Sequence, residues 1–258
     1  MLPTLLTLVL TKLRKTTERA IEWLAKGNYK ILFLALPEDM TNFVNHYMVG
    51  EVSREELWQS YIYLTGLQDP YVNALRYTVD PLLDALHQLK KSIPRLEVYC
   101  YHDLEIHMDA HSLLEKSLLL ETSERARRRI KISAWRDLFE EQLELTAKGF
   151  RRIIENISFH AERNPWTVVL YGGVIESFKR GMEAIGFKVK IIHLHNYWRS
   201  PLEVLERMAQ HWGIHNLSDD AIARCVEDHM RYLDYVLSSQ DIDLAHEKWV
   251  SDTLPKVL

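Results

Sequence analysis

The segment TVVLYGGVIESFKRGMEAIGFKVKIIHL, residues 167–194, constrains the fold more than any other part of the chain. It opens with a short run rich in β-branched residues (167–171), which predicts a strand. Gly172 and Gly173 predict a tight turn, an amphipathic helix follows, and a second apolar run (187–194) predicts another strand. A strand–helix–strand unit of this kind forms two parallel strands joined by a right-handed crossover.

Other apolar runs predict more strands of the same sheet. YKILFLAL (29–36), which lies between a helical pattern and a proline, is typical of a central parallel strand, and LEVYCY (96–101) is another candidate. TLLTLVL (4–10) fits either a strand or the first turns of a helix, because its apolar residues also have helical spacing. We therefore expect an α/β fold with three layers, in which a short, mostly parallel sheet is flanked by many helices.

The rest of the chain has helical patterns. A helical insert is expected at about 42–92, and a long helical pattern at about 110–162 with a break near Thr122 and Ser123. The expected domains are an α/β core over 1–199 and a helical C-terminal extension over 200–258, which could belong to the same domain.

Composition excludes little and favours a cytoplasmic protein. The 258 residues carry a net charge of −4, so nothing global favours nucleic acid or an anionic membrane surface. Only two cysteines occur, Cys100 and Cys225, which fits a reducing compartment, although one disulfide stays open. The apolar N-terminal run follows no basic residue and is too short to span a bilayer, so we do not expect a signal peptide or an anchor.

The densest run of metal-capable side chains is HDLEIHMDAH, residues 102–111, directly after the strand expected at 96–101. If the run is extended, its side chains at Glu105, His107, Asp109 and His111 project to one face, and in a helix His107 and His111 are neighbours. Either geometry could hold Zn, Mn or Fe. No spacing matches a specific zinc motif, and a solvated acidic loop in which Asp109 caps the next helix is the other interpretation.

Polar residues also follow the other expected strands, where ligands of parallel sheets bind. Gly172 and Gly173 open a helix and could offer backbone N–H groups to an anion, although tight turns use such glycines routinely. His193 and His195 face the same side of their strand and form a second metal or acid–base candidate, with Arg199 nearby.

Glu38 stands beside Asp39 at the end of the strand expected at 29–36. These carboxylates could serve as a base or as metal ligands, or they could simply open a helix.

Two groups of residues have both a structural and a functional interpretation. The basic run Arg125, Arg127, Arg128, Arg129 and Lys131, together with Arg136, could contact phosphate or nucleic acid, or form a solvated, salt-bridged helix face. The aromatic residues of the helical insert could pack the helices on each other or line a pocket, and they are Trp58, Tyr61, Tyr63, Tyr71 and Tyr77.

The order of the segments LALPED, VGEVSREELW, YVNAL, LEVYCY, WRD and TVVLYGG resembles the TraB/ChaN/erythromycin-esterase-like superfamily over about 29–194. The resemblance implies an α/β core. Because the members of this superfamily include metal-dependent hydrolases and haem- or iron-binding proteins, it also implies one of these functions. The family's Gly-Glu-x-x-His strand end is missing, and Val174-Ile175 stands where its late histidine would be. The chain would then be a member that lost catalysis, or one that rebuilt its site from residues 102–111. The positions that carry over are Glu38, Arg136, Asp137, Gly172 and Gly173.

These patterns together predict a metal-dependent hydrolase-like protein with its site at the carboxyl ends of the strands. The expected cofactor is a divalent metal (Zn, Mn or Fe), and the substrate a small molecule or a peptide. One alternative is a non-enzymatic scaffold with a protein partner or a second copy, and another is a phosphate or nucleotide binder. The candidate residues are, for catalysis, His102, Asp103 and Glu38; for ligand binding, Gly172, Gly173, Arg136 and Arg199; and for the metal, His102, Glu105, His107, His193 and His195.

Overall fold

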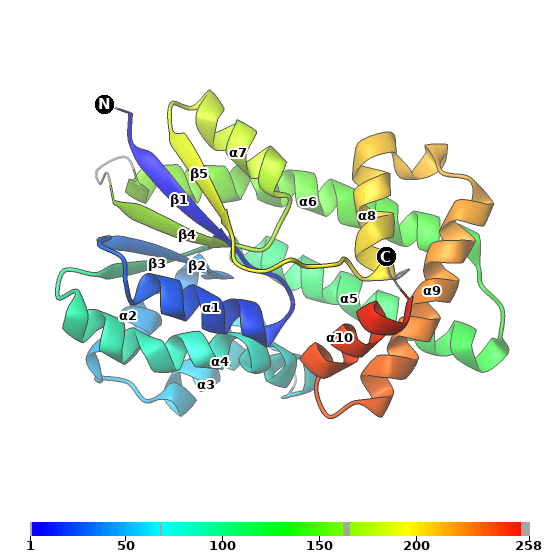
Figure 1. Cartoon of the computed structure of the whole chain (residues 1–258), viewed down its shortest axis with the longest axis horizontal. Helices are drawn as coiled ribbons and strands as arrows, with labels where there is room; N and C mark the ends of the chain where they lie inside the picture. Colours follow the sequence, from blue (N-terminus) through cyan, green and yellow to red (C-terminus); the bar gives the residue numbers. More distant parts are fainter. Residues whose placement is uncertain (1, 68, 162–165, 254–258) are drawn as a thin grey trace. The chain divides into compact units, whose positions relative to one another are not determined.

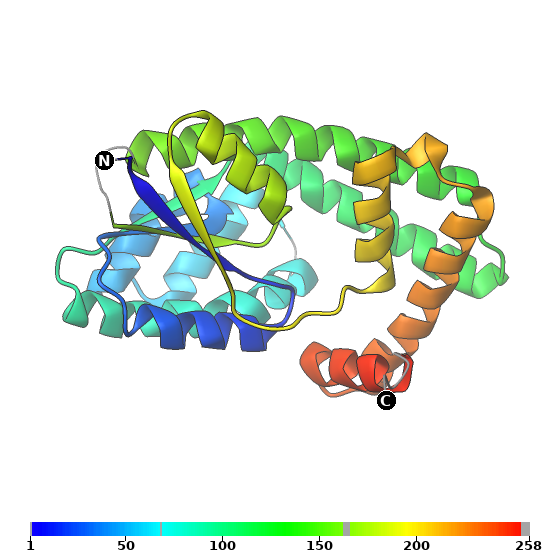
Figure 2. The same cartoon turned by 45° about the horizontal axis from the view of Figure 1, so that its top comes forward.

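The computed structural model describes residues 2–67, 69–161 and 166–253 (Figures 1 and 2). Its described strands form one parallel sheet in the order β3-β2-β4-β1-β5. The strands are β1 (Thr4–Val9), β2 (Ile31–Pro37), β3 (Glu97–His102), β4 (Thr167–Tyr171) and β5 (Lys188–His193).

The first apolar segment of the chain is a strand and not the start of a helix. β1 lies between β4 and β5, and Val9 at its carboxyl end is in register with Tyr171 on one side and His193 on the other. Leu5 and Leu8 point to opposite faces of the sheet and are both fully buried. A strand that is covered on both faces needs apolar side chains at nearly every position. This explains why the apolar residues of the segment also matched helical spacing.

One face of the sheet is covered by the helices that follow β1 and β2. Leu8, Leu32 and Val98 of the sheet pack in a single apolar cluster with residues of these helices, among them Leu24 and Leu83. The helices on this face are α1 (Arg14–Leu24), α2 (Thr41–Val49), α3 (Arg54–Thr65) and α4 (Asp69–Ser92).

The opposite face is covered by the end of α6 (Ile132–Ala161) and by α7 (Ile175–Ala184). Phe33 and Val169 pack there against Ile157 and Phe178. Helices on both faces of a parallel sheet make three layers, so the predicted fold class is confirmed (Figure 1). The connection from β4 leaves on the face opposite to the connections from its two neighbours, β2 and β1, so the topological switch of the sheet is at β4.

The described chain divides into two compact units. Unit 1 comprises residues up to Met108 together with 148–196, and unit 2 comprises 109–147 together with the chain from Tyr197 on. In unit 2, Trp135 of α6 shares an apolar core with Leu205 and Ile222. Its other helices are α5 (Leu104–Arg127) from Asp109 on, α8 (Pro201–Trp212), α9 (Asp219–Ser238) and α10 (Ile242–Thr253). Residues 109–147, which no sequence pattern separated from the α/β core, thus join the C-terminal helices.

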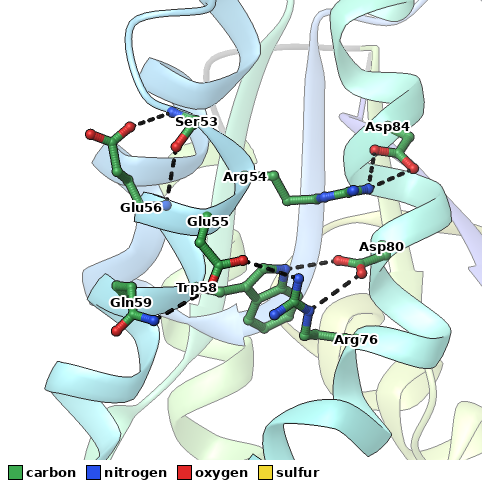
Figure 3. Close-up of polar contacts among 9 residues, drawn as sticks. All are labelled: Ser53, Arg54, Glu55, Glu56, Trp58, Gln59, Arg76, Asp80 and Asp84. Carbon is green, nitrogen blue, oxygen red and sulfur yellow. Dashed lines mark hydrogen bonds and ion pairs between the residues drawn. The ribbon is translucent and has the colours of Figure 1, made fainter.

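Helices α3 and α4 are joined by a polar network around a buried tryptophan (Figure 3). Trp58 is fully buried, and its indole N–H donates a hydrogen bond of 2.8 Å to Asp80 Oδ1. The Arg76 guanidinium lies 5.7 Å from the centroid of the Trp58 ring, and its Nε is 3.5 Å from Asp80 Oδ2. Tyr61 is also fully buried, so these two aromatic side chains of the insert serve packing.

The start of α3 follows its sequence signal. Ser53 Oγ accepts a hydrogen bond from the N–H of Glu56, and the Glu56 carboxylate accepts one from the N–H of Ser53. This capping box satisfies two backbone donors at the helix start, as the Ser-x-x-Glu spacing predicts. Of the helices in the described ranges, none combines the length and the apolar character that crossing a membrane requires.

Candidate acid–base site at the carboxyl ends of β2 and β3

The carboxyl ends of β2 and β3 bring together three of the residues predicted from the sequence. Pro37 and His102 are partners in the register of these neighbouring strands. Glu38 and Asp103 follow directly, so their carboxylates leave the sheet at adjacent places and interact electrostatically. This proximity is a consequence of parallel pairing, since two neighbouring parallel strands end at the same edge.

Glu38 has the properties of a proton-transfer group. Its side chain is accessible to solvent, yet partial burial of the carboxyl group raises its pKa, and the negative charges of Asp39 and Asp103 raise it further. A hydrogen bond from Asn156 and the positive charge of Arg152 act in the opposite direction. A carboxyl group with a raised pKa can hold and release a proton closer to neutral pH than an ordinary glutamate.

Helix α6 supplies two residues that the sequence interpretation missed. Arg152 Nε lies 3.9 Å from Asp103 Oδ2, and the Asn156 side chain donates a hydrogen bond of 3.2 Å to the carbonyl of Tyr101. They stand one helical turn apart and so point to the same side of α6. No local signal identifies them, because they lie about fifty residues from the strand that they meet.

His102 is a neutral side chain in a largely apolar setting. Although part of the residue reaches solvent, burial of the imidazole lowers its pKa to about 4. The ring meets Tyr101 edge to face at 4.8 Å and lies 5.8 Å from the ring of His107, between centroids. His107 Nε2 is itself hydrogen bonded to the Tyr61 hydroxyl at 2.7 Å.

The rest of the histidine-rich run is helical from Leu104, so the extended alternative is wrong. Asp103 Oδ1 accepts a hydrogen bond of 3.1 Å from the N–H of Ile106 and caps α5. The residue suggested for this cap by the sequence was Asp109. Glu105 is exposed and its Oε1 lies 3.3 Å from Lys148 Nζ. In this helix Glu105 and His107 point in different directions, because residues two apart do not face each other.

The predicted metal ligands do not come together. Among the residues that the structure describes, no three His, Cys, Asp or Glu side chains are grouped so as to hold a metal ion. Protein zinc sites use three or four such ligands, so the pair His102 and His107 does not fit a protein-ligated centre by itself. The metal centre expected from the sequence stays a prediction.

His193 and His195 lie on or after the edge strand β5, whereas His102 lies on the other edge strand, β3. β5 and β3 are the two edge strands, four strand intervals apart, which is about 19 Å at ~4.8 Å per interval. His195 Nδ1 is 3.1 Å from the Arg19 guanidinium, which also donates to the carbonyl of Leu194. Both histidines are at the expected carboxyl edge, but they do not share a site with His102.

Gly172 and Gly173 follow β4 at the switch point, and both are exposed. A Cβ atom on Gly173 would lie 2.6 Å from the hydroxyl oxygen of Tyr171, so the Tyr171 side chain in its present place requires glycine there. The N–H of Leu10 donates to the carbonyl of Tyr171 at 2.9 Å and links the ends of β1 and β4. Close packing therefore explains Gly173, and anion binding at this turn remains a prediction.

The two arginines predicted to bind ligand belong to unit 2. Arg136 donates hydrogen bonds of 2.7 Å to the carbonyls of Ile214 and Leu217 and to Asp219 Oδ1, which gives it a structural role at the start of α9. Arg199 is exposed in the segment before α8.

Comparisons of this chain with protein-family models, with curated proteins and with solved structures gave no match.

Proposed function

We propose that unit 1 carries a hydrolase-like acid–base site at the carboxyl ends of β2 and β3, with Glu38 as the proton-transfer group. The observation that carries the proposal is the solvent-accessible Glu38 carboxyl beside the ends of β2 and β3, whose pKa is raised by partial burial and then by the negative charges of Asp39 and Asp103. General acid–base groups need a pKa near the working pH and access to substrate. The pKa of Glu38 is shifted upward, toward neutral pH, and its side chain is exposed. The hydrolase class itself rests on the resemblance to the TraB/ChaN/erythromycin-esterase-like superfamily.

Each neighbour has a defined part in this proposal. Asp39 and Asp103 raise the pKa of Glu38, whereas a hydrogen bond from Asn156 and the positive charge of Arg152 lower it. His102 is neutral at physiological pH, because burial disfavours its protonated form, so its imidazole can donate or accept a hydrogen bond to a substrate without carrying a charge. The site would act on a small molecule or a peptide that presents a carbonyl or phosphoryl bond at the sheet edge.

The titration of Glu38 tests the electrostatic basis without a known substrate. Replacement of Asp103 by Asn keeps a residue that can cap α5 but removes the negative charge, so the pKa of Glu38 should fall. Replacement of Arg152 by Ala removes a positive charge, so the pKa should rise. Carbon-detected NMR of the glutamate carboxyl groups would measure both shifts, and shifts of the same sign in the two variants would contradict the assignment.

A substrate screen tests the function. We expect the purified protein to hydrolyse at least one compound of a chromogenic ester, phosphoester, amide and peptide panel, and Glu38→Gln to lower kcat/KM by about 10²-fold or more. Glu22→Gln is the matched control, because it makes the same substitution at an exposed glutamate of α1 that does not act on Glu38, and it should leave the activity unchanged. Equal activity of wild type and Glu38→Gln would remove Glu38 from the mechanism.

Elemental analysis separates the metal-dependent form of the proposal from the metal-free form. A metal-dependent protein would contain stoichiometric metal that is lost when His102 and His107 are both replaced by Ala. Active protein that stays free of metal after reconstitution and is insensitive to chelators would leave Glu38 as the centre of the chemistry and end the metal prediction.

A further inference from the structure

The turn between α5 and α6 presents a cluster of cations that pair with none of the residues that the structure describes. Helix α5 ends at Arg127 and α6 begins at Ile132, several residues beyond the break expected near Thr122. All four cationic side chains of the turn, Arg127, Arg128, Arg129 and Lys131, are exposed. None of these four side chains forms an ion pair or a hydrogen bond with any residue in the described ranges.

The neighbouring cations of the same basic run behave differently. Arg125 forms an ion pair with Asp234, and Arg136 forms one with Asp219. The prediction of a salt-bridged helix face therefore holds for these two residues and not for the turn between them.

The backbone of the turn is fixed by a buried carboxylate. Glu124 is 5% exposed, and its two oxygens accept hydrogen bonds from the N–H of Lys131 at 2.6 Å and from the indole of Trp135 at 2.8 Å. The N–H of Arg129 donates to the Glu124 carbonyl at 3.3 Å, and Arg128 adopts a left-handed φ of 52°. A fixed backbone holds the four side chains at one place while their charged ends stay in water, which lowers the entropic cost of binding an anion.

The chemistry of the surface indicates the kind of partner. In the described ranges, no large apolar side chain is exposed between Leu119 and Phe159. Protein–protein interfaces usually have an apolar or aromatic centre, whereas contacts with a phosphate backbone need only cations and donors. Three of the four cations are arginines, whose guanidinium groups fit phosphate oxygens in a two-pronged geometry.

We propose that the turn 127–131 binds the phosphate backbone of nucleic acid, independently of base sequence. Acidic residues outnumber Lys and Arg in the rest of unit 2, so the contact is confined to the turn and involves about four phosphates, one per cation. This binding site is separate from Glu38 and does not depend on the proposed hydrolase activity.

Salt dependence of binding measures the number of phosphate contacts. Fluorescence anisotropy with a labelled single-stranded RNA of about 20 nucleotides should give a slope of log K against log salt of about −2.8, from ~0.7 per contact. Arg127→Ala with Arg129→Ala should reduce the slope to about −1.4, because two contacts are lost. Arg128 is left unchanged, since its left-handed backbone could alter the turn on substitution.

The control is Lys188→Ala with Lys190→Ala, which changes the net charge by the same amount at two exposed positions of β5. It should keep the wild-type slope, and circular dichroism should show both double variants folded. The proposal is overturned if wild-type protein shows no salt-dependent binding, or if the control loses as much slope as the arginine variant. It is also overturned if a poly-glutamate chain of equal charge binds as tightly as the RNA, since the partner would then be an acidic protein segment.

Discussion

His102 shows at the residue scale how a strand end can change the chemistry of a side chain. Its sequence context, a histidine followed by an aspartate, suggested a charged or metal-binding group. In the fold, burial of the ring between Tyr101 and His107 lowers its pKa to about 4 and keeps it neutral. Asp103, one residue further, is drawn instead to the start of α5 and to Arg152. The adjacent residues His102 and Asp103 therefore have different environments, one buried and the other polar.

The lowered pKa makes His102 a source of acid sensitivity. The unfolded chain binds a proton at this histidine below pH ~6.5, whereas the folded protein does not until about pH 4, so stability must fall as pH falls between these values. The expected loss between pH 7 and pH 5 is about 2 kcal/mol. We expect His102→Gln to remove this part of the pH dependence.

Hydrogen exchange of peptides from β2 and β3 at pH 7 and pH 5 would measure the effect in unit 1 alone. His193→Gln, at an exposed position of β5, serves as the control and should retain the wild-type pH dependence. A His102→Gln variant that is still destabilised by acid as much as wild type would assign the sensitivity to other groups.

At the scale of elements, two aspartates of α4, Asp80 and Asp84, each pair with an arginine and bond to a residue of α3, but they differ in how far they are buried. Asp80 accepts from Trp58 and pairs with Arg76, and its side chain is 25% exposed. Asp84 pairs with Arg54 through both oxygens, at 2.8 and 3.0 Å, but its side chain is 58% exposed (Figure 3). Burial, and not the number of hydrogen bonds, should decide which aspartate stabilises the helix pair.

This difference predicts unequal effects of two matched substitutions. Asp80→Ala leaves the buried Trp58 indole without its acceptor and should lower the free energy of unfolding by about 1–3 kcal/mol. Asp84→Ala breaks an exposed pair and should cost at most about 1 kcal/mol. Urea unfolding of both variants, followed by tryptophan fluorescence, gives the comparison, and a larger loss for Asp84→Ala would reverse the ranking.

At the scale of the whole molecule, the order of the strands decides which polar strand ends can cooperate. β2 and β3 are neighbours, so Glu38, His102 and Asp103 meet. β5 is at the other edge, so His193 stays about 19 Å away, at ~4.8 Å per strand interval. Each of these segments looks equally suitable in the sequence, because every one is a strand followed by polar residues. Local pattern contains no information on which strands become neighbours.

Local sequence patterns predicted most of the elements: short β-branched runs form strands, Ser53 and Glu56 cap a helix, and the Gly172-Gly173 turn joins β4 to α7, whereas the break predicted near Thr122 lies beyond Arg127. These features follow from local propensity and backbone sterics, which act over a few residues. Three features depend on the tertiary fold: Arg152 and Asn156 reach the end of β3, residues 109–147 join the C-terminal helices, and the four cations of the 127–131 turn find no partner among the described residues. The physical reason is that burial and charge pairing depend on side chains brought together from distant parts of the chain.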